Sequence, residues 1–245
     1  MPNYEIITDS GCDLPASVLQ ELGVQAVPLY VNFRGECLED SVDEGIREMY
    51  AALRAGEAAS TSAVNPDRWA SVMEQALQQG KDVLVIAFSS GLSTTYQSAV
   101  IAAKDLEEAY PDRKILVVDG LSASLGQGLL VYYTCKKRDE GLSLAELAAW
   151  IEDNKQHICH WFTVDDLMYL KRGGRISAAT ALVGTMLKIK PVLHVDDEGH
   201  LISVSKARGR KASIAALLDK IEELCTDTDT DHVCDANACK RYMRE

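Results

Sequence analysis

The 245-residue sequence lacks the features that several classes of protein require. Its net charge of −12 leaves no basic excess, which argues against a surface that binds the phosphates of nucleic acids. No apolar run approaches the roughly 18 residues needed to span a membrane. The first residues lead directly into an expected strand, with no signal-peptide pattern before it. We therefore expect a cytoplasmic protein with no nucleic-acid partner and no integral membrane segment.

Patterns for metals, disulfides and common cofactors are also missing. The seven cysteines are odd in number, scattered and without a C-x-x-C pair, which favours reduced thiols in a cytosol. Cys234 and Cys239 lack the companion ligands that a zinc site needs. The sequence contains no P-loop, no G-x-G-x-x-G and no H-E-x-x-H. We expect no metal and no cofactor.

Short apolar runs alternate with helical patterns through the first part of the chain. The runs "YEIITD", "VQAVPLYV", "DVLVIAF" and "KILVVD" each predict a strand. A fully apolar strand such as "DVLVIAF" is typical of a parallel sheet whose faces are both covered by helices. The succession of strands and helices predicts an α/β fold with a mostly parallel open sheet.

Side chains that cap helices mark several expected helix starts. Asp13 precedes a helical pattern, and Ser41 with Glu44 forms a capping-box pattern. Asn65, followed by proline, predicts the start of another helix, and Ser143 begins a second capping box.

The pattern changes near residue 157. "ICHWFTV" predicts a strand, "SAATALVGTMLKI" a helix, and "KPVLHVDDEGHLISVSKA" two strands joined as an antiparallel hairpin. A long helix, "KASIAALLDKIEELC", follows. We expect a parallel α/β domain over residues 1–156 and a smaller α+β domain over residues 157–245.

Hydroxyl side chains gather where the expected parallel strands end. The groups are Thr8, Asp9 and Ser10; Ser89, Ser90, Ser93 and Thr94; Ser122 and Ser124; and, before another helix, Ser60, Thr61 and Ser62. Ligands of open parallel sheets bind beyond the carboxyl ends of the strands, and helix N-termini favour anions. One such residue alone is more often a helix cap. Four groups near one sheet edge, with free N–H groups beside them, favour a site for an anionic headgroup.

Seven motifs, running from residue 4 to about residue 225, resemble those of the DegV family and occur in the family's order. They are "IITDSGCDLP", "STSAVNPDRW", "FSSGLSTTYQSA", "VVDGLSASLGQG", "TVDDLMYLKRGGRIS", "KIKPVLHVD" and "SKARGRKASI". The resemblance implies a two-domain α/β protein that binds a long-chain fatty acid in a tunnel between its domains. It also implies a lipid-binding subunit, not itself an enzyme, that presents the fatty acid to a separate kinase for phosphorylation to acyl phosphate.

The resemblance assigns site residues by position. Thr61 and Ser93 match the hydroxyls that hold the carboxylate directly, and Ser62, Ser90 and Thr94 lie beside them.

Basic residues and a histidine complete this comparison. Arg172 and Arg175 match one basic segment of the family and Arg208 and Arg210 another, implying contacts with the partner kinase or the acyl phosphate. A solvated basic surface is the alternative explanation for these arginines. The family pattern also has a C-terminal histidine, which His232 does not match.

Two other functions stay open from the residues alone. A serine-dependent hydrolase would use Ser90 or Ser93, although "SSGLST" lacks the G-x-S-x-G elbow. Asp9 is placed like a phosphatase nucleophile, but Gly11 stands where a second acid is usual. A binding module for another small anionic metabolite is the remaining alternative.

Overall fold

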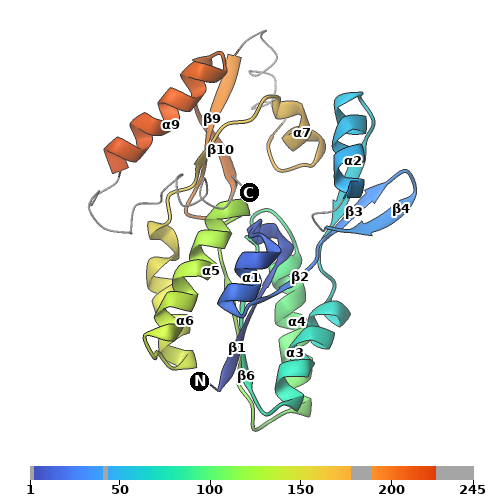
Figure 1. Cartoon of the computed structure of the whole chain (residues 1–245), viewed down its shortest axis with the longest axis vertical. Helices are drawn as coiled ribbons and strands as arrows, with labels where there is room; N and C mark the ends of the chain where they lie inside the picture. Colours follow the sequence, from blue (N-terminus) through green and yellow to red (C-terminus); the bar gives the residue numbers. More distant parts are fainter. Residues whose placement is uncertain (1–2, 41–43, 178–188, 225–245) are drawn as a thin grey trace. The chain divides into compact units, whose positions relative to one another are not determined.

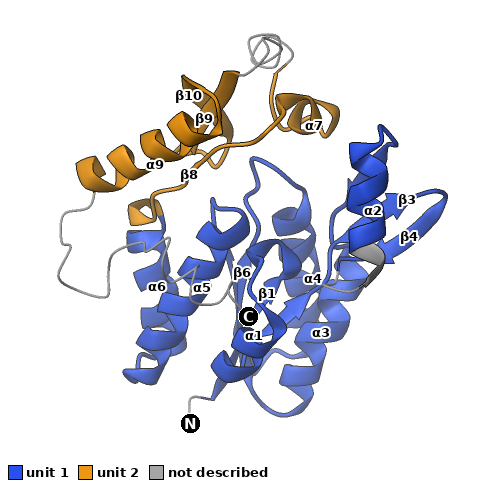
Figure 2. Ribbon diagram, turned by 45° about the horizontal axis from the view of Figure 1, so that its top comes forward, with its two compact units in different colours: residues 1–155 blue, residues 156–245 orange. Residues whose placement is uncertain are grey.

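The computed structural model describes residues 3–40, 44–177 and 189–224 (Figure 1). The chain divides into two compact units, residues 1–155 and residues 156–245 (Figure 2). Among the described residues, no helix combines the length and apolar character needed to cross a membrane.

The first unit is built around a four-stranded parallel sheet, which confirms the expected fold class. Its strands are β1 (Tyr4–Asp9), β2 (Gln25–Val27), β6 (Asp82–Ala87) and β7 (Ile115–Asp119), in the order β2-β1-β6-β7. Thr8 pairs with Ile86, and Ala87 pairs with Asp119. Because the strands run in one direction, their carboxyl ends share one edge of the sheet.

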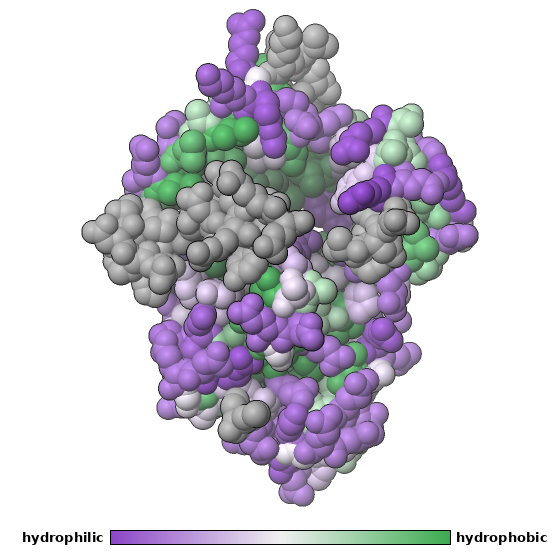
Figure 3. Space-filling model, viewed as in Figure 1, coloured by the Kyte–Doolittle hydropathy of each residue, from purple (hydrophilic) through white to green (hydrophobic). Residues whose placement is uncertain are grey.

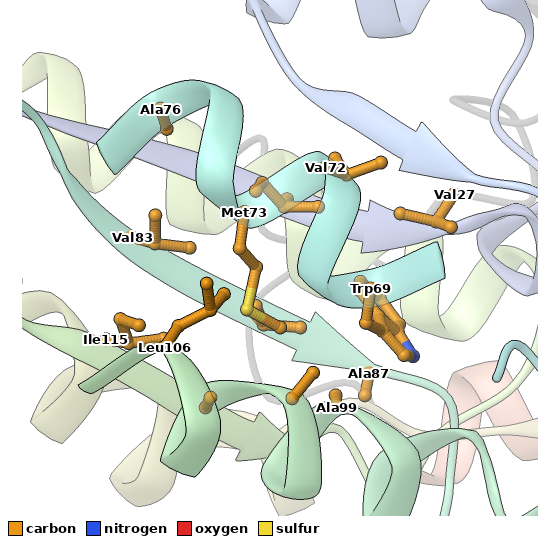
Figure 4. Packing of buried hydrophobic residues seen from close by; sticks show 14 of the residues in the cluster. Val27, Trp69, Val72, Met73, Ala76, Val83, Ala87, Ala99, Leu106 and Ile115 are labelled. Carbon is orange, nitrogen blue, oxygen red and sulfur yellow. The ribbon is translucent and has the colours of Figure 1, made fainter. Parts of the chain in front are cut away.

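Helices lie on both faces of this sheet (Figure 1). They are α1 (Ala16–Leu22), α3 (Pro66–Gln78), α4 (Thr95–Ala109), α5 (Ser124–Asp139) and α6 (Leu144–Asn154), with a short 3-10 helix, η1 (Ser10–Cys12). Helices α3 and α4 pack on one another and on β6, while α6 packs on α5 and on β6 and β7. The core between α3, α4 and the sheet is filled by Trp69, Met73 and Val83, all without exposed surface (Figure 4).

Two of the expected caps form and one does not. The Asn65 side chain accepts the Arg68 N–H at 2.8 Å, and the Ser143 capping box is complete. The expectation for Asp13 is wrong: η1 ends on this residue in a left-handed conformation (φ 53°), and α1 begins after Pro15. Asp13 instead accepts a hydrogen bond from the hydroxyl of Ser124, across the unit. The capping box expected from Ser41 and Glu44 is not visible, because Ser41 lies outside the described residues.

The run "VQAVPLYV" is not one strand, which corrects the expectation. β2 ends at Val27, and β3 (Tyr30–Phe33) belongs to a second, antiparallel sheet with β4 (Glu36–Glu39) and β5 (Ala59–Ser62). Pro28 lies at the break, because proline has no N–H to continue a ladder. Helix α2 (Glu44–Arg54) packs Met49 against Phe33 of this sheet.

The second unit contains the antiparallel hairpin that the sequence predicts. β9 (Ile189–Val195) pairs with β10 (Leu201–Arg208) and with the short β8 (Trp161–Phe162). Among the described residues of this unit, the sheet is accompanied by α7 (Leu167–Arg172) and α9 (Arg210–Leu224), and a short 3-10 helix, η2 (Lys155–His157), precedes it. The helix expected in "SAATALVGTMLKI" falls mostly outside the described residues. Exposed apolar side chains on α9 are visible in Figure 3.

Candidate functional site

Two aspartates hold the loop that carries most of the candidate ligands. This loop, residues 88–94 and here called the hydroxyl loop, joins β6 to α4 at the carboxyl edge of the parallel sheet. The Phe88 N–H donates to Asp9 Oδ2 at 2.7 Å, and the Ser90 N–H donates to Asp119 Oδ1 at 3.1 Å. Asp9 ends β1 and Asp119 ends β7, so the two strands that flank β6 position the loop from both sides.

The backbone of the hydroxyl loop is largely committed to internal hydrogen bonds. The Ser89 carbonyl accepts the N–H groups of Leu92 and Ser93 at 3.0 and 3.1 Å, and its hydroxyl accepts the Gly91 N–H at 3.2 Å. The Ser89 N–H donates to the Ser122 carbonyl at 3.0 Å. All six N–H groups from Phe88 to Ser93 therefore have acceptors within the unit. This corrects the expectation that free N–H groups in this loop would face a ligand.

Thr94 is the N-cap of α4 but its side chain makes no capping hydrogen bond, and Ser93 contacts the first residue of the helix instead. Its Oγ accepts the Thr95 N–H at 3.3 Å and shares a hydrogen bond of 2.8 Å with Thr95 Oγ1, which is buried. Thr94 is exposed, and Ser90 and Ser93 are half-buried. Three candidate hydroxyls thus lie on one short loop.

The other two candidate hydroxyls lie on the second sheet of the same unit. Thr61 and Ser62 are exposed residues of β5, where Thr61 pairs with Val31 of β3. The Ser62 hydroxyl accepts a hydrogen bond from the Asn32 side chain at 2.8 Å. Thr61 and Ser62 therefore belong to a different sheet from the one whose edge carries Ser93. The strand β5 is followed by Asn65, which caps α3.

Several remaining hydroxyls hold the fold together. Thr8 donates to the Ile86 carbonyl at 2.8 Å, Ser10 donates to Asp40 Oδ2 at 2.8 Å, and Ser124 donates to Asp13. Ser122 differs, since its buried Oγ has no hydrogen-bond partner among the described residues. The count of hydroxyls at the sheet edge therefore overstates the number available to a ligand.

Asp9 is the residue whose role sequence reasoning missed. It is fully buried, and its Oδ1 accepts the Gly11 N–H at 3.0 Å while Oδ2 accepts Phe88. Burial raises the pKa of this carboxyl from 3.8 to about 7, against the opposing effect of hydrogen bonds from Phe88, Gln127 and Gly11. The sequence signal that could have indicated this role is a carboxylate at the end of an apolar strand and two residues before a glycine.

The arginines lie on the second unit, at exposed or half-buried positions. Arg172 stacks over the Tyr169 ring at 5.7 Å, and Arg175 donates to the Gly173 carbonyl. Arg210 lies 3.8 Å from Asp165, and Arg208 ends β10.

The carboxylate of Asp165 connects two basic segments of this unit. Besides Arg210 at 3.8 Å, it contacts Lys190 at 3.2 Å, and α7 begins shortly after it. The start of α9 and the loop before α7 are therefore neighbours.

The comparison with known families covers both compact units. A family model described as "Uncharacterised protein, DegV family" matches residues 3–240. The chain belongs to the DegV family. It is 41% identical over 255 residues to a DegV domain-containing protein of Clostridium perfringens, covering 100% of this chain and 88% of that one.

Solved structures of DegV proteins share this fold. A DegV family protein from Thermus thermophilus, described as binding fatty acid, is 36% identical with a TM-score of 0.79, covering 91% of this chain and 78% of that one. The fatty acid kinase (Fak) B3 protein of Streptococcus pneumoniae, loaded with linoleic acid, is 28% identical with a TM-score of 0.79, covering 91% and 79%. A stearic acid-binding protein from Eubacterium ventriosum is also 28% identical, with a TM-score of 0.79, covering 90% and 76%.

Proposed function

We propose that this DegV protein binds a long-chain fatty acid and presents its carboxylate to a partner kinase for phosphorylation to acyl phosphate. Thr61 and Ser93 hold the carboxylate in this proposal, with Ser62, Ser90 and Thr94 beside them. The observation that carries it is the likeness, over about nine-tenths of the chain, to structures that contain fatty acids. The kinase step is supported by the likeness to the Fak B3 protein. The tunnel between domains stays a prediction from the family resemblance.

The chemistry of the hydroxyl loop suits this role. Hydroxyls donate hydrogen bonds to a carboxylate without adding positive charge, so the headgroup contributes orientation more than affinity. Apolar burial supplies about 0.8 kcal/mol for each methylene, before the cost of association is subtracted. A long acyl chain therefore accounts for most of the binding energy.

Native mass spectrometry and organic extraction of the freshly purified protein test the proposal directly. We expect a long-chain fatty acid from the expression host, because an apolar cavity is costly to leave hydrated. Delipidated protein should then take up oleate or palmitate. A clean extract with no uptake of either lipid rejects the proposal, and a bound water-soluble anion in their place favours a metabolite-binding module.

The double variant Thr61→Ala with Ser93→Ala tests the assigned ligands. Losing a hydrogen bond to a charged group costs about 1.5–3 kcal/mol, so we expect weaker oleate binding and a larger loss of acyl phosphate formation. Ser205→Ala, an exposed hydroxyl on β10, is the matched control. Because Ser93 also supports Thr95, unfolding must be measured alongside. A folded double variant with wild-type oleate affinity and wild-type acyl phosphate formation would show that both residues have structural roles only.

Charge reversal tests the basic residues. We propose that Arg172, Arg175, Arg208 and Arg210 contact the partner or the phosphate. Reversal to glutamate should leave oleate binding unchanged and reduce kinase-dependent acyl phosphate formation, more strongly at low salt. Unchanged turnover with a matched kinase would identify these arginines as solvated surface.

A further inference from the structure

The carboxyl edge of the parallel sheet contains a buried polar cluster that the proposed ligand contacts do not use. It consists of five side chains with no exposed surface: Thr8, Asp9, Ser89, Ser122 and Gln127. Its members come from β1, the hydroxyl loop, the segment after β7, and α5, so the cluster joins segments that are far apart in the sequence. Asp9 is its one ionisable member, and its carboxylate accepts the first N–H of the hydroxyl loop.

No positive charge compensates Asp9 within the described residues. Its hydrogen-bond donors are the N–H groups of Phe88 and Gly11, and Gln127 approaches from α5. Two ionisable groups interact electrostatically with Asp9. They are Asp40, which accepts a hydrogen bond from the adjacent Ser10, and Cys12. Both carry either no charge or negative charge, so among the described residues only neutral hydrogen-bond donors offset the cost of burying the Asp9 carboxylate.

Gln127 supplies a second observation. The Thr8 hydroxyl donates its hydrogen bond to the Ile86 carbonyl, so Thr8 Oγ1 can act only as an acceptor toward Gln127. Gln127 Nε2 donates to Thr8 Oγ1 at 3.1 Å. This fixes the orientation of the amide and leaves Gln127 Oε1 buried, with no donor among the described residues. Gln127 also acts on Asp9 as a hydrogen-bond donor, which lowers the pKa of Asp9 and favours the carboxylate. The observation that favours protonation of Asp9 is its complete burial without a compensating cation among the described residues.

We propose that Asp9 is a positioning residue for the headgroup, and that seating an anion at the hydroxyl loop is coupled to uptake of one proton from solvent by the Asp9 carboxyl. This inference rests on the proposed function. Asp9 holds the first N–H of the loop, and the loop folds back so that Ser93 donates to Ser89, which keeps Ser90 and Ser93 close to that anchor. Two like charges in a desolvated region disfavour one another, and protonation of Asp9 removes one of them.

The test is the pH dependence of oleate affinity for delipidated protein, measured by equilibrium dialysis between pH 5.5 and 9 at constant ionic strength. For the wild type we expect constant affinity below about pH 6 and a loss approaching about tenfold per pH unit above pH 7. Asp9→Asn should lose this dependence, because an amide does not titrate. Ionisation of oleate itself is common to both proteins and cancels in the comparison. Asp119→Ala, which removes the acceptor of the Ser90 N–H, should weaken binding equally at every pH.

Calorimetry of the wild type keeps the inference falsifiable if Asp9→Asn does not fold. Oleate binding in buffers of different ionisation enthalpy should show proton uptake that is larger at pH 8 than at pH 6, where Asp9 already holds its proton. A proton taken up by oleate would give the opposite order and overturn the inference. Oleate binding with parallel pH profiles in wild type and Asp9→Asn overturns it as well. No oleate binding by the wild type at any pH rejects the proposed function, and this inference with it.

Discussion

Replacing Asp9 by asparagine should make the stability of the first unit less dependent on pH. In the wild type, the pKa of this carboxyl rises from 3.8 in the unfolded chain to about 7 in the folded protein. The folded state therefore holds the proton more tightly, and the free energy of unfolding falls as pH increases between these two values. At about 1.4 kcal/mol per pH unit, the loss approaches roughly 4 kcal/mol by pH 8.

Asparagine removes the ionisation but also one acceptor. Its amide has one oxygen for the two N–H groups of Gly11 and Phe88, and an unsatisfied buried donor costs about 1–3 kcal/mol at every pH. We therefore expect the variant to be less stable than the wild type near pH 4 and equally or more stable near pH 8. The difference between the two proteins should change by several kcal/mol across this range, with the variant gaining as pH rises.

Urea unfolding at half-unit pH intervals, followed by tryptophan fluorescence, measures this difference. Two of the three tryptophans, Trp69 and Trp150, lie in the first unit. All other carboxyl groups are common to both proteins, so their titration cancels. A difference in unfolding free energy that stays constant from pH 4 to pH 8.5 would show that Asp9 is an ordinary carboxyl and refute the reasoning.

Three further changes have defined expectations. Trp69→Phe should lower the free energy of unfolding by about 1–3 kcal/mol in urea titrations, because it removes the hydrogen bond of 3.2 Å from the indole to the Thr95 carbonyl; an unchanged midpoint would contradict this. Gly11→Ala places a Cβ 2.4 Å from the Phe88 ring and should cost about 1–3 kcal/mol, visible as a lower melting temperature; equal melting would show that the ring can move. Glu146→Gln should destabilise at pH 7, because hydrogen bonds from Ser143 lower the pKa of Glu146. The destabilisation should become smaller as the pH falls and the carboxyl protonates; an effect that does not change with pH would exclude that origin.

The parallel sheet was predictable because its signals are local. The run "DVLVIAF" is apolar throughout, and it forms the central strand β6 with no exposed side chain from Val83 to Ala87. The caps at Asn65 and Ser143 bind N–H groups only three residues away, so sequence spacing alone identifies them. These features depend on residues that are close together in the sequence, so they can be predicted without the fold.

The features that sequence reasoning missed depend on distant partners. Asp9 meets Phe88 across 79 positions, and Asp13 meets Ser124 across 111. Neither pairing is visible in local patterns, so Asp13 was expected to cap the nearest helix, and Asp9 was weighed as a member of the polar groups at the sheet edge or as a nucleophile. The break at Pro28 is different, since proline was a local signal against one continuous strand.

The hydrogen bonds of the hydroxyl loop explain why its serines and threonines, rather than its backbone, are the ligand groups in the proposed function. Asp9 and Asp119 take up the N–H groups of Phe88 and Ser90, and Ser89 takes up those of Gly91, Leu92 and Ser93. A loop built in this way is rigid but offers no row of backbone donors to an anion. Its remaining donors are hydroxyls, which rotate and can accept as well as donate. A carboxylate held only by such groups keeps oxygen lone pairs free, which phosphoryl transfer to that oxygen requires.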